Sequence, residues 1–246
     1  MQVEMLGPLN VRILGGDDGR GSGDGPAVVL LHGFGATGTD LVPLANYIDA
    51  PPGTRFVFPE APLALDHMFG VPARAWWMID MERMQRAMMT GQVRDLTRDV
   101  PEGLASARDM LIECLDAVSE RLGVTDDRTI VGGFSQGAML TTDVTLRTER
   151  PFAGLAVLSG TLLAEKEWTP KMPARAGLPV FQSHGRVDPI LPFSFAEQLH
   201  AALVDAGLKA SFVPFSGQHE IPMEVLEGLG RFVLEALAAR PVEDVR

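Results

Sequence analysis

Short apolar runs alternate with segments of helical periodicity along most of this chain. The run Ala27–Leu31 is apolar at every position. A strand with no polar side is buried on both faces, which is typical of the centre of a parallel sheet. Similar runs predict further strands at Val11–Leu14, Arg55–Phe58, Thr129–Gly133, Gly154–Ser159, Pro179–His184 and Ser211–Pro214.

Helices are predicted where apolar residues recur every three or four positions. The clearest pattern lies in Glu102–Leu122, where Leu104, Leu111, Leu115 and Val118 share one face. The other predicted helices are Thr39–Ile48, Gln136–Thr148, Phe193–Ala206 and Pro222–Ala239. Strands that alternate with helices predict an α/β fold with a mostly parallel central sheet flanked by helices. No internal repeat or linker interrupts the pattern, so we expect a single domain over residues 1–246.

Residues 62–101 break the alternation and form a short Met/Trp-rich insertion. The segment holds Trp76 and Trp77 and the methionines Met78, Met81, Met84, Met88 and Met89, and we expect it to include a short helix. Methionine at this density suits an adaptable apolar pocket or lid. A small helix that buries its methionines against the body fits the pattern equally well.

Composition and charge narrow the classes of function. The chain is 46% hydrophobic and 22% charged, as in ordinary globular proteins, and its formal net charge is −11. This charge repels nucleic acid and anionic membrane surfaces, so neither is an expected partner. Neither a signal peptide nor an apolar run long enough to span a bilayer is found, so we expect a cytoplasmic protein without stable membrane insertion. The single cysteine, Cys114, falls on the apolar face of a predicted helix and is expected to pack there. The sequence leaves a homodimer open.

The pentapeptide Gly133-Phe134-Ser135-Gln136-Gly137 fits the pattern G-x-S-x-G between a predicted strand and a predicted helix. A serine on such a tight strand-to-helix turn projects its hydroxyl from the edge of the sheet. The flanking glycines are needed because a Cβ at either position would collide with the turn. We therefore predict that Ser135 is a catalytic nucleophile.

A serine nucleophile needs a base to take its proton and a carboxylate to orient that base. Asp188 and His219 follow Ser135 in the order Ser, Asp, His, each in a loop after a predicted strand. Parallel strands bring their carboxyl ends to one edge of the sheet, where the three side chains would meet. His184 precedes Asp188 and breaks the order, so we expect a packing role for it. Glu220 is a weaker candidate for a supporting role.

The oxyanion of an acyl-transfer intermediate needs two amide donors. One is expected from the backbone of Gln136, directly after the nucleophile, and the other from Phe34 in the glycine-rich turn His32-Gly33-Phe34-Gly35. His32 is a candidate for ordering this turn. No phosphate-binding or metal-binding motif accompanies these residues, so neither a cofactor nor a metal is expected.

Several motifs together resemble the phospholipase/carboxylesterase family of α/β-hydrolases, and the resemblance covers almost the whole chain. They occur in the family's order: Leu31-His32-Gly33-Phe34-Gly35, Phe58-Pro59-Glu60-Ala61-Pro62, Arg74-Ala75-Trp76-Trp77, the elbow at Ser135, the block His184–Ile190 and Gly217-Gln218-His219-Glu220-Ile221. The family includes acyl-protein thioesterases and bacterial carboxylesterases. The resemblance implies an α/β-hydrolase fold and a cofactor-free serine hydrolase of carboxylic or thioester bonds. It also implies the triad Ser135, Asp188 and His219, with Phe34 and Gln136 as oxyanion donors.

This chain departs from the family pattern in its methionine-rich segment and in Gln218, where glycine often precedes the histidine. We expect Trp76, Trp77 and Met78 to shape the substrate pocket. The predicted function is that of a carboxylesterase acting on a small ester or acyl substrate. A lysophospholipase or an acyl-protein thioesterase is the alternative enzyme, and an inactive hydrolase-fold binding protein is the alternative of another class.

Overall fold

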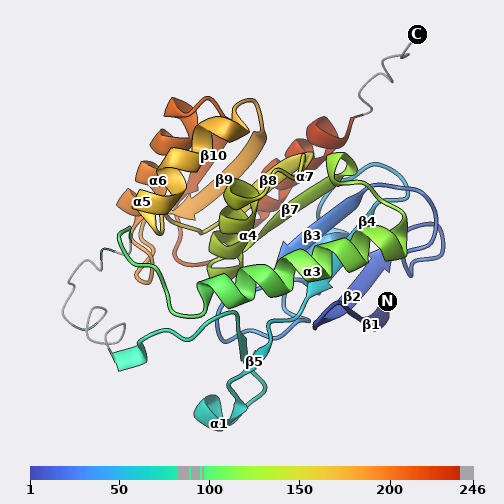
Figure 1. Cartoon of the computed structure of the whole chain (residues 1–246), viewed down its shortest axis with the longest axis horizontal. Coiled ribbons are helices and arrows are strands. Elements are labelled where there is room, and N and C mark those ends of the chain that lie inside the picture. Colours follow the sequence, from blue (N-terminus) through green and yellow to red (C-terminus); the bar gives the residue numbers. More distant parts are fainter. Residues whose placement is uncertain (83–88, 90–94, 96, 239–246) are drawn as a thin grey trace.

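A computed structural model describes residues 1–82, 89, 95 and 97–238. Within these residues the main sheet has eight strands in the order β1-β2-β4-β3-β7-β8-β9-β10 (Figure 1). The strands are β1 (Gln2–Leu6), β2 (Leu9–Gly15), β3 (Ala27–Leu31), β4 (Arg55–Pro59), β7 (Thr129–Phe134), β8 (Gly154–Leu158), β9 (Pro179–Gly185) and β10 (Lys209–Phe215). Strands β4, β3, β7, β8, β9 and β10 are parallel, and β1 and β2 add an antiparallel edge. The predicted mostly parallel sheet is confirmed.

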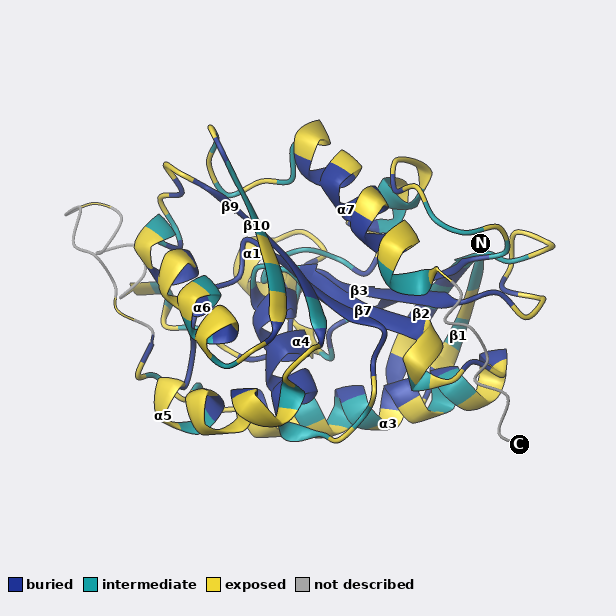
Figure 2. Cartoon of the chain, turned by 90° about the horizontal axis from the view of Figure 1, so that it is seen from above, coloured by how far each residue is buried: buried dark blue, intermediate teal, exposed yellow. Residues whose placement is uncertain are grey.

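Helices cover both faces of this sheet. They are α3 (Leu104–Leu122), α4 (Gln136–Arg147), α5 (Glu165–Trp168), α6 (Phe193–Asp205), α7 (Met223–Leu237) and the 3-10 helices η1 (Val42–Asn46), η2 (Asp126–Arg128) and η3 (Thr169–Arg175). Helix α7 lies on one face, and α3 and α4 lie on the other (Figure 2). Along β3, Val28 and Leu30 join the core beneath α7, whereas Val29 and Leu31 join the core beneath α3 and α4. The wholly apolar run is therefore a strand buried on both sides, as predicted.

The predicted elements match the structure to within two residues at each end, except for one helix. In place of the helix predicted over Thr39–Ile48 there is only the 3-10 helix η1. Its turns are closed by i→i+3 hydrogen bonds, which Leu44 N–H donates to Leu41 O at 3.0 Å and Tyr47 N–H donates to Leu44 O at 2.9 Å. The strand predicted over Gly154–Ser159 ends at Leu158, because Ser159 turns to a φ of 50°.

The insertion begins with a small projecting unit. It consists of β5 (Leu63–Ala64), the short helix α1 (Asp66–Phe69) and β6 (Arg74–Ala75), and it extends away from the sheet (Figure 1). Most of the following methionine-rich stretch, including Met84 and Met88, lies outside the described residues.

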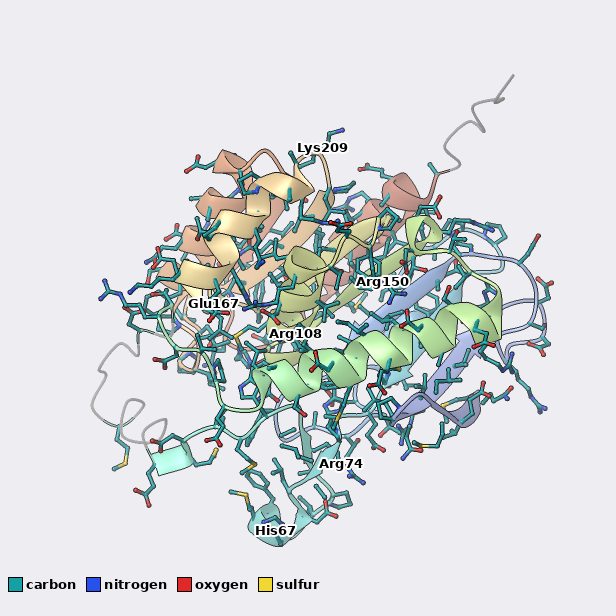
Figure 3. All side chains as sticks on the ribbon, viewed as in Figure 1. His67, Arg74, Arg108, Arg150, Glu167 and Lys209 are labelled. Atoms are coloured by element: carbon teal, nitrogen blue, oxygen red, sulfur yellow. The ribbon has the colours of Figure 1, made fainter. Side chains whose placement is uncertain are left out.

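A buried ion cluster joins α4 to its neighbours on the α3 side of the sheet. Asp143 on α4 is fully buried and accepts hydrogen bonds from Arg108 of α3 at 2.9 Å, from Arg147 at 2.7 Å and from the indole of Trp168 at 2.7 Å. Arg147 also pairs with Glu167 of α5, and Figure 3 shows Arg108 and Glu167 beside α4. These partners satisfy the Asp143 carboxylate inside the protein, so this acid is structural and fixes the helix that follows Ser135.

Candidate active site

Ser135 occupies the turn between β7 and α4 in a strained conformation. Its φ of 55° and ψ of −117° lie in a region that non-glycine residues rarely adopt. Its backbone N–H donates to Leu158 O at 2.9 Å, which ties the turn to the end of β8. A Cβ on Gly133 would lie 2.6 Å from Leu31 O, and one on Gly137 would lie 2.3 Å from the same atom. Both glycines are therefore required by close packing against β3, as the pattern predicts.

Asp188 and His219 meet through a short hydrogen bond. His219 Nδ1 lies 2.6 Å from Asp188 Oδ2, and because a carboxylate oxygen only accepts, the Nδ1 atom carries the proton. The Nε2 atom of His219 is thereby left as the basic nitrogen. His219 and Ser135 line the same cavity, and the ring of Phe134 packs 4.7 Å from the imidazole. Among the hydrogen bonds of the described residues, none joins Ser135 Oγ to His219.

The loops that carry Asp188 and His219 are bound to each other through their backbones. Val187 N–H donates to Gly217 O at 3.1 Å, and Arg186 N–H donates to Phe215 O at 2.9 Å. A Cβ on Gly185 would lie 2.1 Å from Gln218 O, so only glycine permits this approach. The pairing of the two side chains thus depends on contact between two loops that follow adjacent parallel strands.

The Asp188 carboxylate has four donors. Its Oδ1 accepts the N–H groups of Ile190 at 2.8 Å and Leu191 at 2.9 Å, and its Oδ2 lies near His184 Nε2 at 3.2 Å as well as His219. Burial alone would raise the pKa of Asp188, but the hydrogen bonds from the two histidines and from Leu191 outweigh it and hold that pKa well below 3.8. The carboxylate is therefore charged at neutral pH.

The turn after β3 lies directly against the elbow. A Cβ on Gly33 would stand 3.3 Å from the Cβ of Ser135. Gly35 has a φ of 81°, and its N–H donates to Arg74 O at 2.8 Å, which ties the turn to β6. Within the described residues, no backbone hydrogen bond engages the N–H of Phe34 or of Gln136. Both predicted donors border the cavity that Ser135 faces.

The His32 side chain fixes the conformation of this turn through two hydrogen bonds. The Ala61 N–H donates to its Nε2 at 3.1 Å, so its Nδ1 carries the proton and donates to Gly33 O at 2.8 Å. Burial, the largest cause, lowers the pKa of His32 and keeps the ring neutral. The arrangement agrees with the loop-ordering role predicted for His32.

The two tryptophans have different places. Trp77 and Met78 line the cavity, whereas Trp76 lies behind the wall, where its indole N–H donates to His32 O at 2.9 Å. Gln136 also holds this segment, since its Oε1 accepts the Trp76 N–H at 2.9 Å and its Nε2 donates to Trp77 O at 2.8 Å. Of the three residues predicted for the pocket, Trp77 and Met78 therefore line the cavity, and Trp76 supports the turn. The side-chain role of Gln136 has no signal in the sequence beyond its place inside the elbow.

The cavity at this site has a volume of about 430 Å³, which suits a small organic ligand. Ser135 and His219 stand together on its wall. Apolar side chains that sequence reasoning missed form much of the rest: Ile79, Val100, Phe134, Met139, Leu163, Ile190 and Leu191. They come from six separate segments, which only the fold brings together.

The part of the chain that the structure describes holds neither a metal-binding cluster nor a membrane-spanning helix. No group of three histidine, cysteine, aspartate or glutamate side chains there could hold a metal ion. In the same residues, no helix has the length and apolar character needed to cross a membrane.

Known proteins resemble this chain over most of its length. A family model described as phospholipase/carboxylesterase matches residues 21–236. The acyl-protein thioesterase 1 of Eremothecium gossypii is 29% identical over 213 residues, which cover 84% of this chain and 81% of the relative. The acyl-protein thioesterase 1 of Kluyveromyces lactis is 29% identical over 225 residues, with coverage of 85% and 91%.

Solved structures show the same fold. The crystal structure of esterase PE8 superposes with a TM-score of 0.77 at 28% identity and covers 93% of this chain and 99% of that chain. The Bacillus cereus carboxylesterase superposes with a TM-score of 0.68 at 18% identity, with coverage of 93% and 94%, and at that identity it supports the fold alone.

Proposed function

The chain belongs to the phospholipase/carboxylesterase family of α/β-hydrolases, and we propose that it is a carboxylesterase that acts through Ser135, His219 and Asp188. The family makes it a hydrolase. The observation that carries the proposal is the 2.6 Å hydrogen bond between His219 Nδ1 and Asp188 Oδ2. His219 lines the same cavity as Ser135, whose backbone is strained. A nucleophile, a base and an orienting carboxylate in one cavity match the requirements of acyl transfer.

In the first half of the reaction, Ser135 Oγ attacks the carbonyl carbon of the ester while His219 Nε2 takes the hydroxyl proton. The C–O bond to the alcohol then breaks, and the imidazolium returns its proton to the departing alkoxide. Asp188 holds His219 in the Nδ1–H form and stabilises the imidazolium, because its carboxylate is charged and has no proton to exchange. The product of this half is an acyl-enzyme on Ser135.

The negative oxygen of each tetrahedral intermediate is stabilised by the backbone N–H groups of Phe34 and Gln136. The amide of Gln136 is at the start of α4, where the helix dipole adds to the attraction. In the second half, His219 takes a proton from water, the resulting hydroxide attacks the acyl carbonyl, and Ser135 regains its proton. No cofactor enters either half.

Hydrolysis of p-nitrophenyl esters tests this function. Ser135→Ala is expected to lower kcat on the order of 10⁴- to 10⁶-fold, as for loss of a triad serine. Ser194→Ala, an exposed serine on α6, is the matched control and is expected to retain wild-type turnover. Equal turnover by all three proteins would exclude Ser135 as the nucleophile.

An acyl-protein thioesterase or lysophospholipase activity is the second candidate. The relatives named acyl-protein thioesterase 1 and the apolar cavity wall support it. A series of p-nitrophenyl esters from acetate to palmitate separates the candidates. A kcat/KM that rises steadily to the longest acyl chains favours the thioesterase or lysophospholipase. A maximum of kcat/KM at short acyl chains favours the carboxylesterase. Absence of turnover on all esters and thioesters would support the inactive binding protein instead.

A further inference from the structure

Two imidazoles share one oxygen of the Asp188 carboxylate. His219 Nδ1 lies 2.6 Å from Oδ2, and His184 Nε2 lies 3.2 Å from the same atom. His219 lines the cavity, whereas His184 is not among its lining residues and is fully buried. We propose that His184 is a positioning residue that fixes the direction and the charge of Asp188 toward His219. This inference rests on the proposed function of the triad.

The protonation of His184 follows from its neighbours. Its Nε2 lies 2.8 Å from Leu191 O and 3.2 Å from Asp188 Oδ2, and neither oxygen can donate. Nε2 therefore carries a proton that is shared between the two acceptors. Its Nδ1 has no partner among the described residues, so a second proton there would bury an unpaired N–H. His184 is accordingly a donor to the carboxylate through Nε2.

Packing alone does not account for a histidine at this position. The ring is buried beside Phe193, with the ring centroids 6.2 Å apart, and an apolar side chain would fill this space without an unpaired nitrogen. Burial of a polar group with an unsatisfied atom costs free energy. The hydrogen bonds that His184 Nε2 donates toward Asp188 Oδ2 and Leu191 O offset this cost.

The first consequence is geometric. Oδ1 of Asp188 is fixed by the N–H groups of Ile190 and Leu191, and Oδ2 is fixed by the two imidazoles. His184 also holds Leu191 O, and so closes the loop from which those amides come. Without His184, both the carboxylate plane and the loop beneath it lose a constraint. His219 would then be oriented less tightly toward Ser135.

The second consequence is electrostatic. Donation from His184 draws negative charge away from the oxygen that faces His219. Loss of this donor leaves more negative charge on the Asp188 oxygen beside His219 and favours the protonated form of His219, which cannot act as a base. The other titratable or charged groups around the triad are Arg186, which lies over Phe193, Glu220, which accepts the Gln218 N–H, and Asp40, Asp80 and Asp99 on the cavity wall. We expect each of these groups to stay in place when His184 is replaced.

The test compares His184→Leu with His184→Gln, whose side-chain amide restores an N–H donor at similar reach. The matched control is His200→Leu, because His200 also has an unpaired Nδ1 and packs on Phe212 at 5.2 Å, but belongs to α6 and makes no bond to Asp188. For His184→Leu we expect kcat to fall about 10- to 100-fold with little change in KM, as for loss of one hydrogen bond to a charged group. The acid limb of the kcat/KM profile should also move to higher pH. His184→Gln should recover most of both effects, and His200→Leu should match the wild type in both.

Two results would overturn the proposal. One is a folded His184→Leu enzyme with wild-type kcat and pH profile. The other is loss of activity in all three variants in proportion to their loss of thermal stability, because that pattern indicates packing alone. If His184→Leu does not fold, His184→Gln decides the matter: kcat within about tenfold of wild type supports the proposal, and a larger loss contradicts it.

The ¹H NMR resonance of the His219 Nδ1 proton separates this inference from the proposed function, because it needs no turnover. The proposal predicts a changed resonance in His184→Leu and an unchanged one in His200→Leu. A wild-type protein without esterase activity would defeat the proposed function, yet the resonance would still report on the His184 contact. An active wild type whose resonance and kinetics are insensitive to His184 would defeat this inference alone.

Discussion

The side chain of Gln136 spans from the start of α4 to the backbone of Trp77, with its Nε2 atom 2.8 Å from Trp77 O. Its Oε1 atom accepts the neighbouring Trp76 N–H at 2.9 Å, so one amide side chain fixes the backbone of two successive residues. The backbone N–H of the same residue borders the cavity as a proposed oxyanion donor. The elbow and the cavity wall at Trp77 are thus held together by one residue.

Replacement of Gln136 by alanine tests this connection. Gln136→Ala keeps the backbone donor but leaves two buried backbone groups unpaired, at about 1–3 kcal/mol each. We expect KM for a p-nitrophenyl octanoate to rise more than KM for the acetate, because only the longer acyl chain should reach the wall at Trp77. Gln182→Ala is the control, since Gln182 on β9 is also buried and its side chain donates to Ala196 O on α6. Equal changes in the two KM values for Gln136→Ala would disprove the connection.

A second prediction concerns the contact between the loops that carry Asp188 and His219. In Gly185→Ala the new Cβ would meet Gln218 O at 2.1 Å and Gly217 O at 2.5 Å, and both are backbone atoms that cannot turn aside. The loop with His219 must move away, so we expect kcat to fall at least 100-fold, since about 1 Å of misplacement costs this much. Far-UV circular dichroism should stay native.

Gly70→Asn is the control for a glycine substitution. Gly70 ends α1 with a φ of 69°, and an added Cβ there meets nothing within 4 Å. Asparagine tolerates this conformation, so activity should be unchanged. A Gly185→Ala enzyme with wild-type kcat would contradict the proposed dependence on loop contact.

A third prediction separates stability from activity. Arg55 begins β4, is fully buried, and donates to the carbonyls of Gly23, Gly25 and Leu122. Arg55→Met leaves these carbonyls without donors, so we expect the free energy of unfolding to fall by about 2–4 kcal/mol. Arg55 lies at the amino end of β4, whereas the site lies at the carboxyl ends of the parallel strands. We therefore expect kcat below the melting temperature to be unchanged. Urea denaturation measures the first effect, and the exposed Arg20→Met is the control. A loss of kcat without a loss of stability would contradict this assignment.

The fourth prediction follows from the lowered pKa of Asp188. A carboxyl group whose pKa is lower in the folded state stabilises the protein above its unfolded pKa, near 3.8, and loses this contribution as pH falls toward the folded value. The difference in free energy of unfolding between wild type and Asp188→Asn should therefore be largest at neutral pH and shrink below pH of about 4. Urea denaturation at several pH values measures it. A difference that grows as the pH falls would have the wrong sign.

The elements that sequence predicts best are those whose pattern reflects burial directly. The wholly apolar Ala27–Leu31 and the elbow between Thr129 and Arg147 have local causes, namely two-sided burial and a turn too tight for a Cβ. The positions of Asp188 and His219 can also be predicted from the sequence, because the carboxyl ends of parallel strands lie at one edge of the sheet. Their hydrogen bond was expected from chain order and is present in the structure.

Other features have no local signal. Strand β1 was not predicted because its apolar residues Val3 and Met5 face solvent, while Glu4 turns inward and pairs with Arg121 of α3. The contacts of Gln136 with Trp77 and of His184 with Leu191 depend on where loops lie in space. No spacing rule encodes such contacts.

The most direct test of the central claim is the site of a covalent fluorophosphonate adduct. Trypsin releases residues 129–147 as one peptide, in which Ser135 is the only serine. Incubation of the native protein with the probe, followed by digestion and tandem mass spectrometry, should place a single adduct on Ser135 and find none in Ser135→Ala. An adduct on another residue, or equal labelling of the wild type and Ser135→Ala, would contradict the assignment of Ser135 as the nucleophile.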